Sequence, residues 1–213
     1  EALWDVLTGV INPAGRLAET MPVRLADDPT ADSFPAVENA VYAEGLLSRY
    51  RFHETVGVSP AFGLGFGLSY TTFEYSDLRL DSAGASFTVE NTGSRAGSDV
   101  AQLYVGRVSP SALQRPTREL KGFEKVRLEA GASVTTRIPF TDRTFRYFDL
   151  AAGAWQVEAG EYEVAVGPSL GELPLRENLT VDGAEAAAKV GASIAAVAAT
   201  ASDAIGPNSQ IPG

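Results

Sequence analysis

The sequence predicts a mainly β protein whose central part folds as a β-sandwich of the immunoglobulin type. Short segments of alternating apolar and polar residues follow one another from Thr71 onward, and turn signals separate them about every 8–12 residues. No helical pattern interrupts the series, which disfavours parallel βαβ topology. Roughly seven short strands within about 110 residues are typical of this sandwich.

The segments with strand character place every second side chain on the same face of a sheet. In chain order they are 72–80, 85–93, 98–108, 118–128, 132–140, 143–150, 155–160, 161–167 and 177–181. In the second segment, Phe87 and Val89 share one face. The third segment has large or apolar residues on both faces: Val100, Gln102 and Tyr104 on one, and Ala101, Leu103 and Val105 on the other.

The N-terminal third lacks this alternation and is interpreted as a piece of another domain. Residues 1–9 place Leu3, Val6 and Leu7 on one helical face, and Gly9 provides a C-terminal stop. One short helix cannot bury that face alone, so we expect it to pack on neighbours from elsewhere. The chain begins with Glu rather than with an initiator Met, which indicates a piece cut from a longer polypeptide.

Two further segments precede the sandwich. The turn at Asn12-Pro13 leads towards a strand candidate that ends near Val23. Residues 41–53 alternate only weakly, so a strand and an irregular segment are both open for them.

Composition disfavours several classes of function. The 213 residues carry a formal net charge of -10, and such a surface repels phosphate backbones, so we expect no nucleic-acid partner. No apolar run approaches the roughly 20 residues that span a bilayer, so we expect no membrane partner. The chain has no cysteine and a single histidine, His53, so we expect no metal and no cofactor. A bacterial cytoplasmic and a secreted location both stay open.

The stretch 63–73, GLGFGLSYTTF, resembles a phosphate-binding loop because its glycines alternate. A dinucleotide fingerprint, however, needs a following helix, and here SYTTFEY, which is rich in β-branched and aromatic residues, follows instead. We interpret the glycines as structural, since they let a backbone cross closely over packed rings. The rings expected to be buried there are Phe62, Phe66, Tyr70 and Phe73.

Acidic residues are the remaining candidates for chemistry, because paired carboxylates at a defined separation catalyse glycoside hydrolysis. The candidates are Asp27, Asp28, Glu44, Glu90, Glu119, Asp142, Asp149 and Glu161. In a chain of this net charge most such side chains are simply solvated. His53 lacks a nucleophile elbow near it and is interpreted as a packed or surface residue. We therefore assign no catalytic, cofactor-binding or metal-binding residue.

The composition shifts after Gly183 to an alanine-rich tail. One side of a helix there would carry Val190, Ile194, Val197, Ala201 and Ile205. A helix docked on the sandwich, a linker to a further domain and a partly disordered tail all fit this pattern.

Several motifs in one order resemble the C-terminal part of glycoside hydrolase family 3. NPAGRLAETMP, YAEGLLSRYRF and PAFGLGFGLSYTTFEYSDL are similar to the end of that family's α/β sandwich domain. VENTGSRAGSDVAQLYV, RPTRELKGFEKVRLEAGAS, RYFD and WQVEAGEYEVAVGPS are similar to its fibronectin type III-like domain. The resemblance covers about residues 2–182 and places the glycine-rich stretch at the join of the two domains.

The resemblance implies a fold class and a domain order. The fold is mainly β, an immunoglobulin or fibronectin type III-like β-sandwich preceded by the C-terminal remnant of an α/β sandwich domain. The expected parts are residues 1–68, the α/β remnant and linker; residues 69–182, the sandwich; and residues 183–213, the helical or partly disordered tail. Three positions depart from the family pattern: Arg49 where a second glycine is usual, Phe66 where Tyr is usual, and His53 where an aromatic is common.

The resemblance also implies a function, that of a retaining β-glycosidase acting on oligosaccharides or glycosides. The family's nucleophilic Asp and acid/base Glu belong to other parts of the enzyme, so neither matches a residue of this chain. We expect this portion to stabilise the enzyme, to border the substrate site, and to be inactive alone. Its partners would be the sugar substrate and the barrel and α/β domains of the same enzyme. The alternative is a stand-alone carbohydrate-binding or structural β-sandwich module.

Overall fold

The computed structural model describes residues 1–33, 39 and 41–185. The chain divides into two compact units. The first contains residues 1–144 and 160–181, and the second contains residues 145–159 together with the chain from 182 onward. The helix expected after residue 183 lies outside the described residues.

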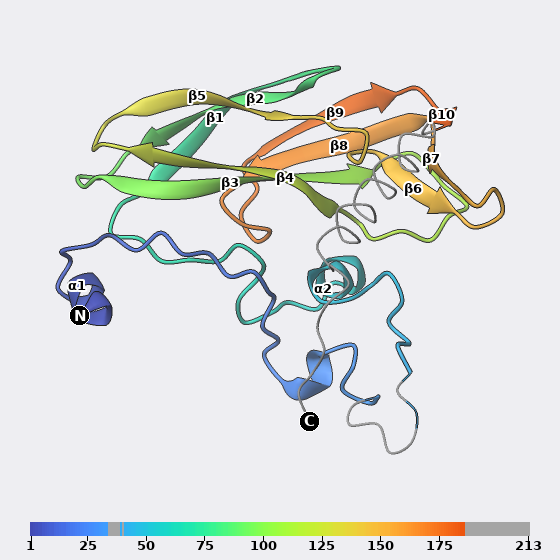
Figure 1. Ribbon diagram of the computed structural model, residues 1–213, viewed down its shortest axis with the longest axis horizontal. Helices are drawn as coiled ribbons and strands as arrows, with labels where there is room; N and C mark the ends of the chain where they lie inside the picture. Colours follow the sequence, from blue (N-terminus) through green and yellow to red (C-terminus); the bar gives the residue numbers. More distant parts are fainter. Residues whose placement is uncertain (34–38, 40, 186–213) are drawn as a thin grey trace, which may run out of the picture. The chain divides into compact units, whose positions relative to one another are not determined.

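Two antiparallel sheets form most of the first unit (Figure 1). One sheet has the order β1-β2-β5, and the other has the order β4-β3-β8-β9. The strands are β1 (Phe73–Asp81), β2 (Gly84–Asn91), β3 (Gly97–Arg107), β4 (Glu119–Leu128), β5 (Ser133–Pro139), β8 (Gly160–Gly167) and β9 (Leu175–Val181). Each of them falls on a segment with the expected alternation, so the mainly β sandwich is confirmed.

The core of the sandwich lies between the two sheets. On β2, Phe87 and Val89 are fully buried, as their shared face predicts. On the facing sheet, in the register of β3 and β8, Leu103 pairs with Val166 and Val105 pairs with Val164. These aliphatic side chains point to one side of the sheet because successive residues of a strand alternate between faces.

Strand β3 is buried on both faces. Residues 101–105 are all buried, including Gln102 and Tyr104 on the face opposite Leu103. The cover for this second face comes from the described part of residues 1–72, called the N-terminal segment below, which runs along the outer side of the four-stranded sheet (Figure 1).

The described residues of the N-terminal segment form two α-helices and one 3-10 turn. They are α1 (Ala2–Leu7), η1 (Leu25–Asp27) and α2 (Tyr50–Val56). The expected helix at the start is confirmed by α1, with Gly9 at a φ of +75° just after it. The strand candidate before Val23 is reduced to one isolated bridge between Met21 and Phe62.

A strand or an irregular segment was expected for residues 41–53, and this was wrong for the last four of them. Residues 41–49 are irregular, but residues 50–53 belong to α2, which ends at Gly57 in the left-handed conformation. This helix has only two turns, so its period is difficult to recognise in the sequence. Tyr50 and His53, three positions apart, lie on neighbouring turns; His53 is buried and Tyr50 is partly buried.

The described part of the second unit is a small antiparallel sheet of order β10-β7-β6. It contains β6 (Arg146–Asp149), β7 (Ala154–Val157) and β10 (Ala184–Glu185). Phe148 contacts the edge of Trp155, and the guanidinium of Arg146 lies 4.3 Å from the centre of the Trp155 ring. The domain boundaries expected at residues 68 and 182 stay a prediction.

Candidate functional site

The glycine-rich stretch crosses the outer face of β3. Gly65 has a φ of +84°, and a Cβ atom there would lie 2.1 Å from Nε2 of Gln102. At Gly67 a Cβ atom would lie 2.5 Å from the carbonyl oxygen of Gly15. Strand β1, and no helix, follows this stretch, so it has no helix N-terminus to hold phosphate. Gly65 and Gly67 are there because a side chain and a second backbone approach too closely for any other residue.

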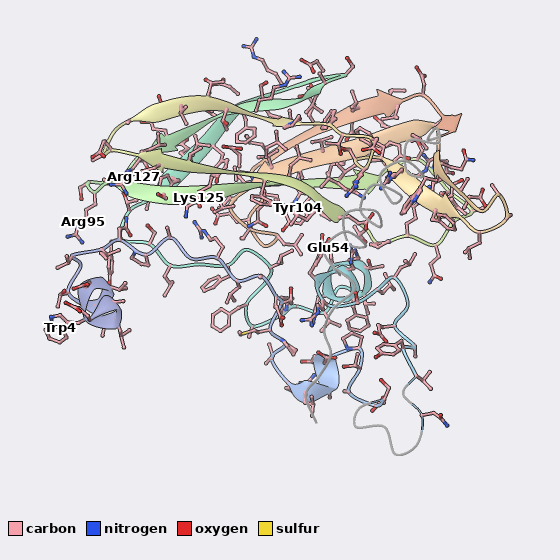
Figure 2. All side chains as sticks on the ribbon, in the orientation of Figure 1. Trp4, Glu54, Arg95, Tyr104, Lys125 and Arg127 are labelled. Carbon is pink, nitrogen blue, oxygen red and sulfur yellow. The ribbon has the colours of Figure 1, made fainter. Side chains whose placement is uncertain are left out.

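A small apolar cluster lies under this crossing. Leu64 packs with Tyr104, Ala165 and Leu173, and Tyr50 from α2 covers them. The rings of Tyr50 and Tyr104 meet edge to face with centroids 6.4 Å apart, and Tyr104 lies on the side of the sheet that faces the N-terminal segment (Figure 2). This cluster is a second hydrophobic core on the outer face of the sheet.

The aromatic residues expected to fill the junction do not do so. Phe62, Phe66 and Tyr70 are about 40% exposed, and Phe73 is half-buried. The backbone N–H of Phe66 donates to the carbonyl of Gly63, which closes a turn. Phe62 and Phe66 then contact one another, with centroids 4.8 Å apart, while Leu64 inside that turn packs on the sheet.

A buried polar network fastens the segment to β3. Asp99 is 1% exposed and accepts hydrogen bonds from the guanidinium of Arg16, from the hydroxyl of Tyr75 at 2.8 Å, and from the backbone N–H of Val100. Burial, and then the neighbouring Asp99 carboxylate, raises the pKa of Tyr75 well above its usual range. Arg16 also donates to the carbonyl of Gly67 at 3.4 Å. The network therefore joins both sheets and the N-terminal segment through one carboxylate.

Ion pairs and hydrogen bonds hold α2 beside the first residues of β4. Glu54 lies 3.0 Å from the guanidinium of Arg118, and Arg51 lies 3.2 Å from Glu119. The hydroxyl of Tyr50 accepts a hydrogen bond from the backbone N–H of Leu120. Helix α2 is thus oriented by directional contacts as well as by the apolar cluster.

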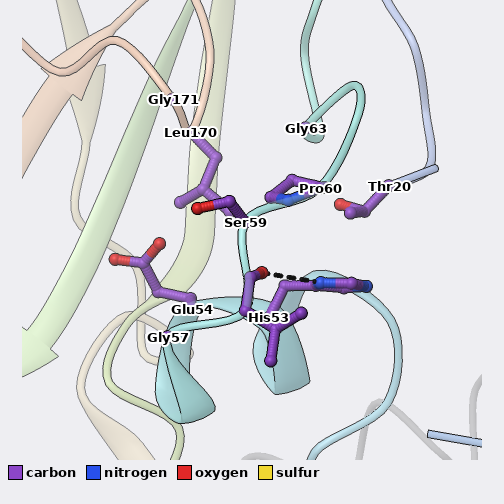
Figure 3. A pocket seen from close by; sticks show the side chains of 10 residues that line it. Thr20, His53, Glu54, Gly57, Ser59, Pro60, Gly63, Leu170 and Gly171 are labelled. Atoms are coloured by element: carbon purple, nitrogen blue, oxygen red, sulfur yellow. Dashed lines mark hydrogen bonds between the residues drawn. The ribbon is translucent and has the colours of Figure 1, made fainter. Parts of the chain in front are cut away.

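His53 is a packed residue, as interpreted from the sequence. It is 5% exposed, and its Nδ1 lies 2.9 Å from the carbonyl oxygen of Val58. Since a carbonyl only accepts, Nδ1 donates this hydrogen bond. The side chain lines a pocket of about 340 Å³ beside α2 (Figure 3).

The acidic candidates serve mainly as partners of neighbouring groups. A hydrogen bond from Arg24 holds the pKa of Asp27 below its usual range, and hydrogen bonds from Thr30 do the same for Asp28. Glu119 pairs with Arg51 and Lys121, and Glu161 accepts from Asn178. Within the described ranges no group of three or more His, Cys, Asp or Glu residues could hold a metal ion. The absence of a catalytic residue stays a prediction.

The N-terminal segment exposes much apolar surface. Trp4 is 69% exposed and projects away from α1 (Figure 2). Most of the exposed large apolar side chains of the described chain precede Thr71, and they include Leu3, Leu7, Val10, Val23, Leu25, Val41, Tyr42, Leu46 and Leu68. We call this set the apolar surface of the segment. Isolated monomers rarely expose so many apolar groups in one region, so this surface fits a docking role.

The residues that build the junction were not singled out from the sequence. They are Arg16, Tyr50, Leu64, Asp99, Gln102 and Tyr104. The sequence of β3 did contain an indication of this junction, because both faces of the strand carry large or apolar side chains. Such a strand needs a covering layer on its second face.

Comparison with known proteins locates the chain within larger ones. A family model described as fibronectin type III-like domain matches residues 99–170. The chain is 42% identical over 190 residues to thermostable beta-glucosidase B of Acetivibrio thermocellus, which is 85% of this chain and 25% of that protein. It is 37% identical to an exo-alpha-(1->6)-L-arabinopyranosidase of Bifidobacterium longum, with the same two shares.

Solved structures agree with these matches. The GH3 beta-glucosidase of Bifidobacterium adolescentis superposes with a TM-score of 0.81 at 37% identity, covering 85% of this chain and 28% of that one. The beta-glucosidase of Kluyveromyces marxianus in complex with glucose gives a TM-score of 0.78 at 38% identity, covering 85% and 23%. The chain spans about a quarter of the length of the curated relatives it matches.

The described fold is therefore a fibronectin type III-like sandwich with a second layer fastened to the outer face of one sheet. Since its relatives contain the same pair of regions, both parts of the chain have counterparts in them. The chain matches the C-terminal region of glycoside hydrolase family 3 beta-glucosidases. No helix in the described part of the chain is long and apolar enough to cross a bilayer.

Proposed function

We propose that this chain belongs to a retaining β-glycosidase of β-glucosidase type, which removes terminal β-linked sugars from oligosaccharides or glycosides. The observation that carries this proposal is the match of 84–85% of the chain to proteins named as beta-glucosidases. Those names favour a glycosidase over a stand-alone carbohydrate-binding or structural module.

Within that enzyme, the chain stabilises the other domains and borders the substrate site. The apolar surface of the N-terminal segment docks on the remainder of the α/β sandwich domain and on the barrel domain. Burial of apolar area would supply the free energy of docking, at roughly 25 cal/mol per Å². The sandwich holds the segment in one orientation through Asp99 and the glycine-rich crossing.

The chemistry itself is assigned to groups outside this chain. Retaining hydrolysis needs a nucleophilic carboxylate and an acid/base carboxyl about 5–5.5 Å apart across one glycosidic bond. We assign neither catalytic role to any residue of this chain. The boundaries that we propose for its three parts are 1–68, 69–182 and 183–213. A second candidate activity, hydrolysis of α-L-arabinopyranosides, follows from the name of the Bifidobacterium longum relative.

The test compares a longer protein that contains this chain with the 213-residue chain alone. Both are assayed on 4-nitrophenyl β-D-glucopyranoside, β-D-xylopyranoside and α-L-arabinopyranoside. We expect turnover by the longer protein, fastest on the glucoside, and none above background by the chain alone. Turnover by the chain alone would contradict the assignment of the catalytic groups, and a longer protein inactive on all three would contradict the activity.

A glycine substitution tests the stabilising role. Gly65→Val adds a strained backbone and a clash with Gln102, whereas Gly131→Val adds a similar strain with nothing within 4 Å. In the longer protein we expect Gly65→Val to lower Tm more than Gly131→Val and to reduce kcat/KM by at least about tenfold, which is about 1.4 kcal/mol. Equal Tm and kcat/KM values for the two variants would contradict a stabilising role of the junction.

A further inference from the structure

The pocket beside α2 contains unused hydrogen-bonding groups. It lies between α2, the loop that follows it, and the turn between β8 and β9 (Figure 3). Its lining includes Thr20, His53, Glu54, Ser59, Pro60 and Leu170. At about 340 Å³ it lies at the lower end of the range for small-ligand sites.

Three polar side chains offer free hydrogen-bonding capacity. Because Nδ1 of His53 donates to the carbonyl of Val58, Nε2 is the ring nitrogen left to meet a ligand. Within the described residues no hydrogen bond engages the hydroxyl of Ser59, which is exposed. Thr20 accepts from the backbone N–H of Leu64 at 3.2 Å, so its hydroxyl proton can be donated. The set contains both donors and acceptors.

The remaining walls are small or apolar. Pro60 and Leu170 supply aliphatic surface, and glycines leave the space between them open. A Cβ atom at Gly63 would lie 4.0 Å from both Pro60 and the backbone nitrogen of Gly171, so this glycine borders the empty volume without being strained. Aliphatic patches beside mixed donors and acceptors suit the hydroxyl groups and C–H faces of a polyol.

Charge around the pocket selects against ions. Glu54 forms part of the wall, with one carboxylate oxygen beside Arg118. The lining includes no Lys or Arg side chain to pair with an anion, and the described residues hold no group of ligands suited to a metal cation.

We propose that this pocket binds a neutral polyhydroxylated molecule of monosaccharide size. The described lining contains no Phe, Tyr or Trp ring on which a sugar could stack, so binding is weak, with a Kd on the order of 1 mM. The proposal does not depend on the proposed function, because binding requires no catalytic group.

The test uses the fact that His53 is the only histidine of the chain. NMR signals of its imidazole ring, at constant pH, are followed while D-glucose, glycerol or inorganic phosphate is added to the 213-residue chain. We expect a saturable shift with glucose, a weaker one with glycerol and none with phosphate. No saturable shift with glucose up to about 100 mM, or a shift with phosphate of equal size, would overturn the proposal.

Two variants tie the signal to the pocket. Ser59→Ala removes one hydroxyl, and Gly63→Val fills the space between Pro60 and Gly171; each should weaken glucose binding by about tenfold or more. The control is Ser133→Ala, at an exposed position on β5, which should bind as the unchanged chain does. Backbone NMR spectra verify that each variant is folded. Folded variants that both bind glucose unchanged would overturn the proposal.

Discussion

The two faces of the four-stranded sheet β4-β3-β8-β9 are buried by different means. The inner face uses aliphatic side chains such as Leu103 and Val166 against the aromatic and β-branched residues of β2. The outer face is covered by the N-terminal segment, where the hydroxyl of Tyr50 accepts a hydrogen bond from the backbone N–H of Leu120. On the same face Gln102 donates to the carbonyl of Pro168 and accepts from the hydroxyl of Tyr104.

This difference separates stability from orientation. Apolar burial is strong but has no direction, so the inner face holds the sheets together without defining a single partner geometry by itself. Hydrogen bonds weaken steeply when misaligned, so the outer face defines how the segment lies on the sheet. Since the segment carries the apolar surface, its orientation also determines where that surface points.

The largest expected effect comes from the inner face. Phe87→Ala removes a fully buried ring and should lower the free energy of unfolding by about 4 kcal/mol. Urea denaturation measures this change. The matched outer-face variant, Leu64→Ala, should cost about 2 kcal/mol and should release the N-terminal segment first, as increased hydrogen exchange at residues 62–67. If both variants lowered the free energy of unfolding equally and neither released the segment first, the proposed difference between the two faces would be contradicted.

The next effect comes from the buried charge pair of Arg16 and Asp99, which fastens the N-terminal segment to β3. Arg16→Met leaves Asp99 buried without its cation and should cost about 3 kcal/mol of unfolding free energy in urea denaturation. The double variant Arg16→Met with Asp99→Asn removes the stranded charge and should recover part of that loss. If it recovers nothing, charge burial is not the cause.

A smaller effect, one that depends on pH, should separate the two buried tyrosines from exposed ones. Burial raises the pKa of both Tyr75 and Tyr104 above the unfolded value near 10. The two tyrosines therefore contribute fully to the free energy of unfolding below a pH of about 10. This contribution is lost as the pH rises through their folded-state pKa values. Above pH 10 each should reduce unfolding free energy by about 1.4 kcal/mol per pH unit. Denaturation at several alkaline pH values measures the slope.

Substitution identifies the source of that slope. Tyr104→Phe removes one ionisable hydroxyl and should make the alkaline fall shallower. Tyr42→Phe, the same change on an 83% exposed side chain, is the control. A slope that Tyr104→Phe leaves unaltered would mean that other groups cause the alkaline loss.

The smallest effect is a gain at the start of α2. Arg49 has a φ of +54° and a ψ of -126°, a backbone region that favours glycine. Its ion pair with Glu19 is exposed on both sides and contributes little. Arg49→Gly should therefore raise the free energy of unfolding by about 1 kcal/mol, measured as a higher urea midpoint. Arg49→Ala, which loses the ion pair and keeps the strain, should give no gain.

Local patterns in the sequence were sufficient for the strands but not for the junction. The alternation around Phe87 and Val89 identifies both a strand and its buried face, because both properties depend on neighbours in the chain. The pairing of Arg16 with Asp99 joins positions 83 residues apart, and no local period contains it. Helix α2 was missed for a related reason, since a two-turn helix is stabilised mainly by what it packs on.

For the glycine-rich stretch too, the sequence predicts only part of the structure. Its glycines could be identified as structural from the residues that follow them. Which side chains they would leave buried could not be predicted, because the turn between Gly63 and Phe66 decides that Leu64, and not its aromatic neighbours, packs on the sheet.

Strand β3 lies between two protein layers, and this has a consequence for how the molecule opens. Water can reach the middle amides of an edge strand through small fluctuations, but the amides near Leu103 are enclosed by a paired strand on each side and by a layer above and below. Their deuterium uptake should wait for cooperative unfolding of the first unit. The slowest-exchanging protons of this unit would then mark β3 as the last element to lose its structure.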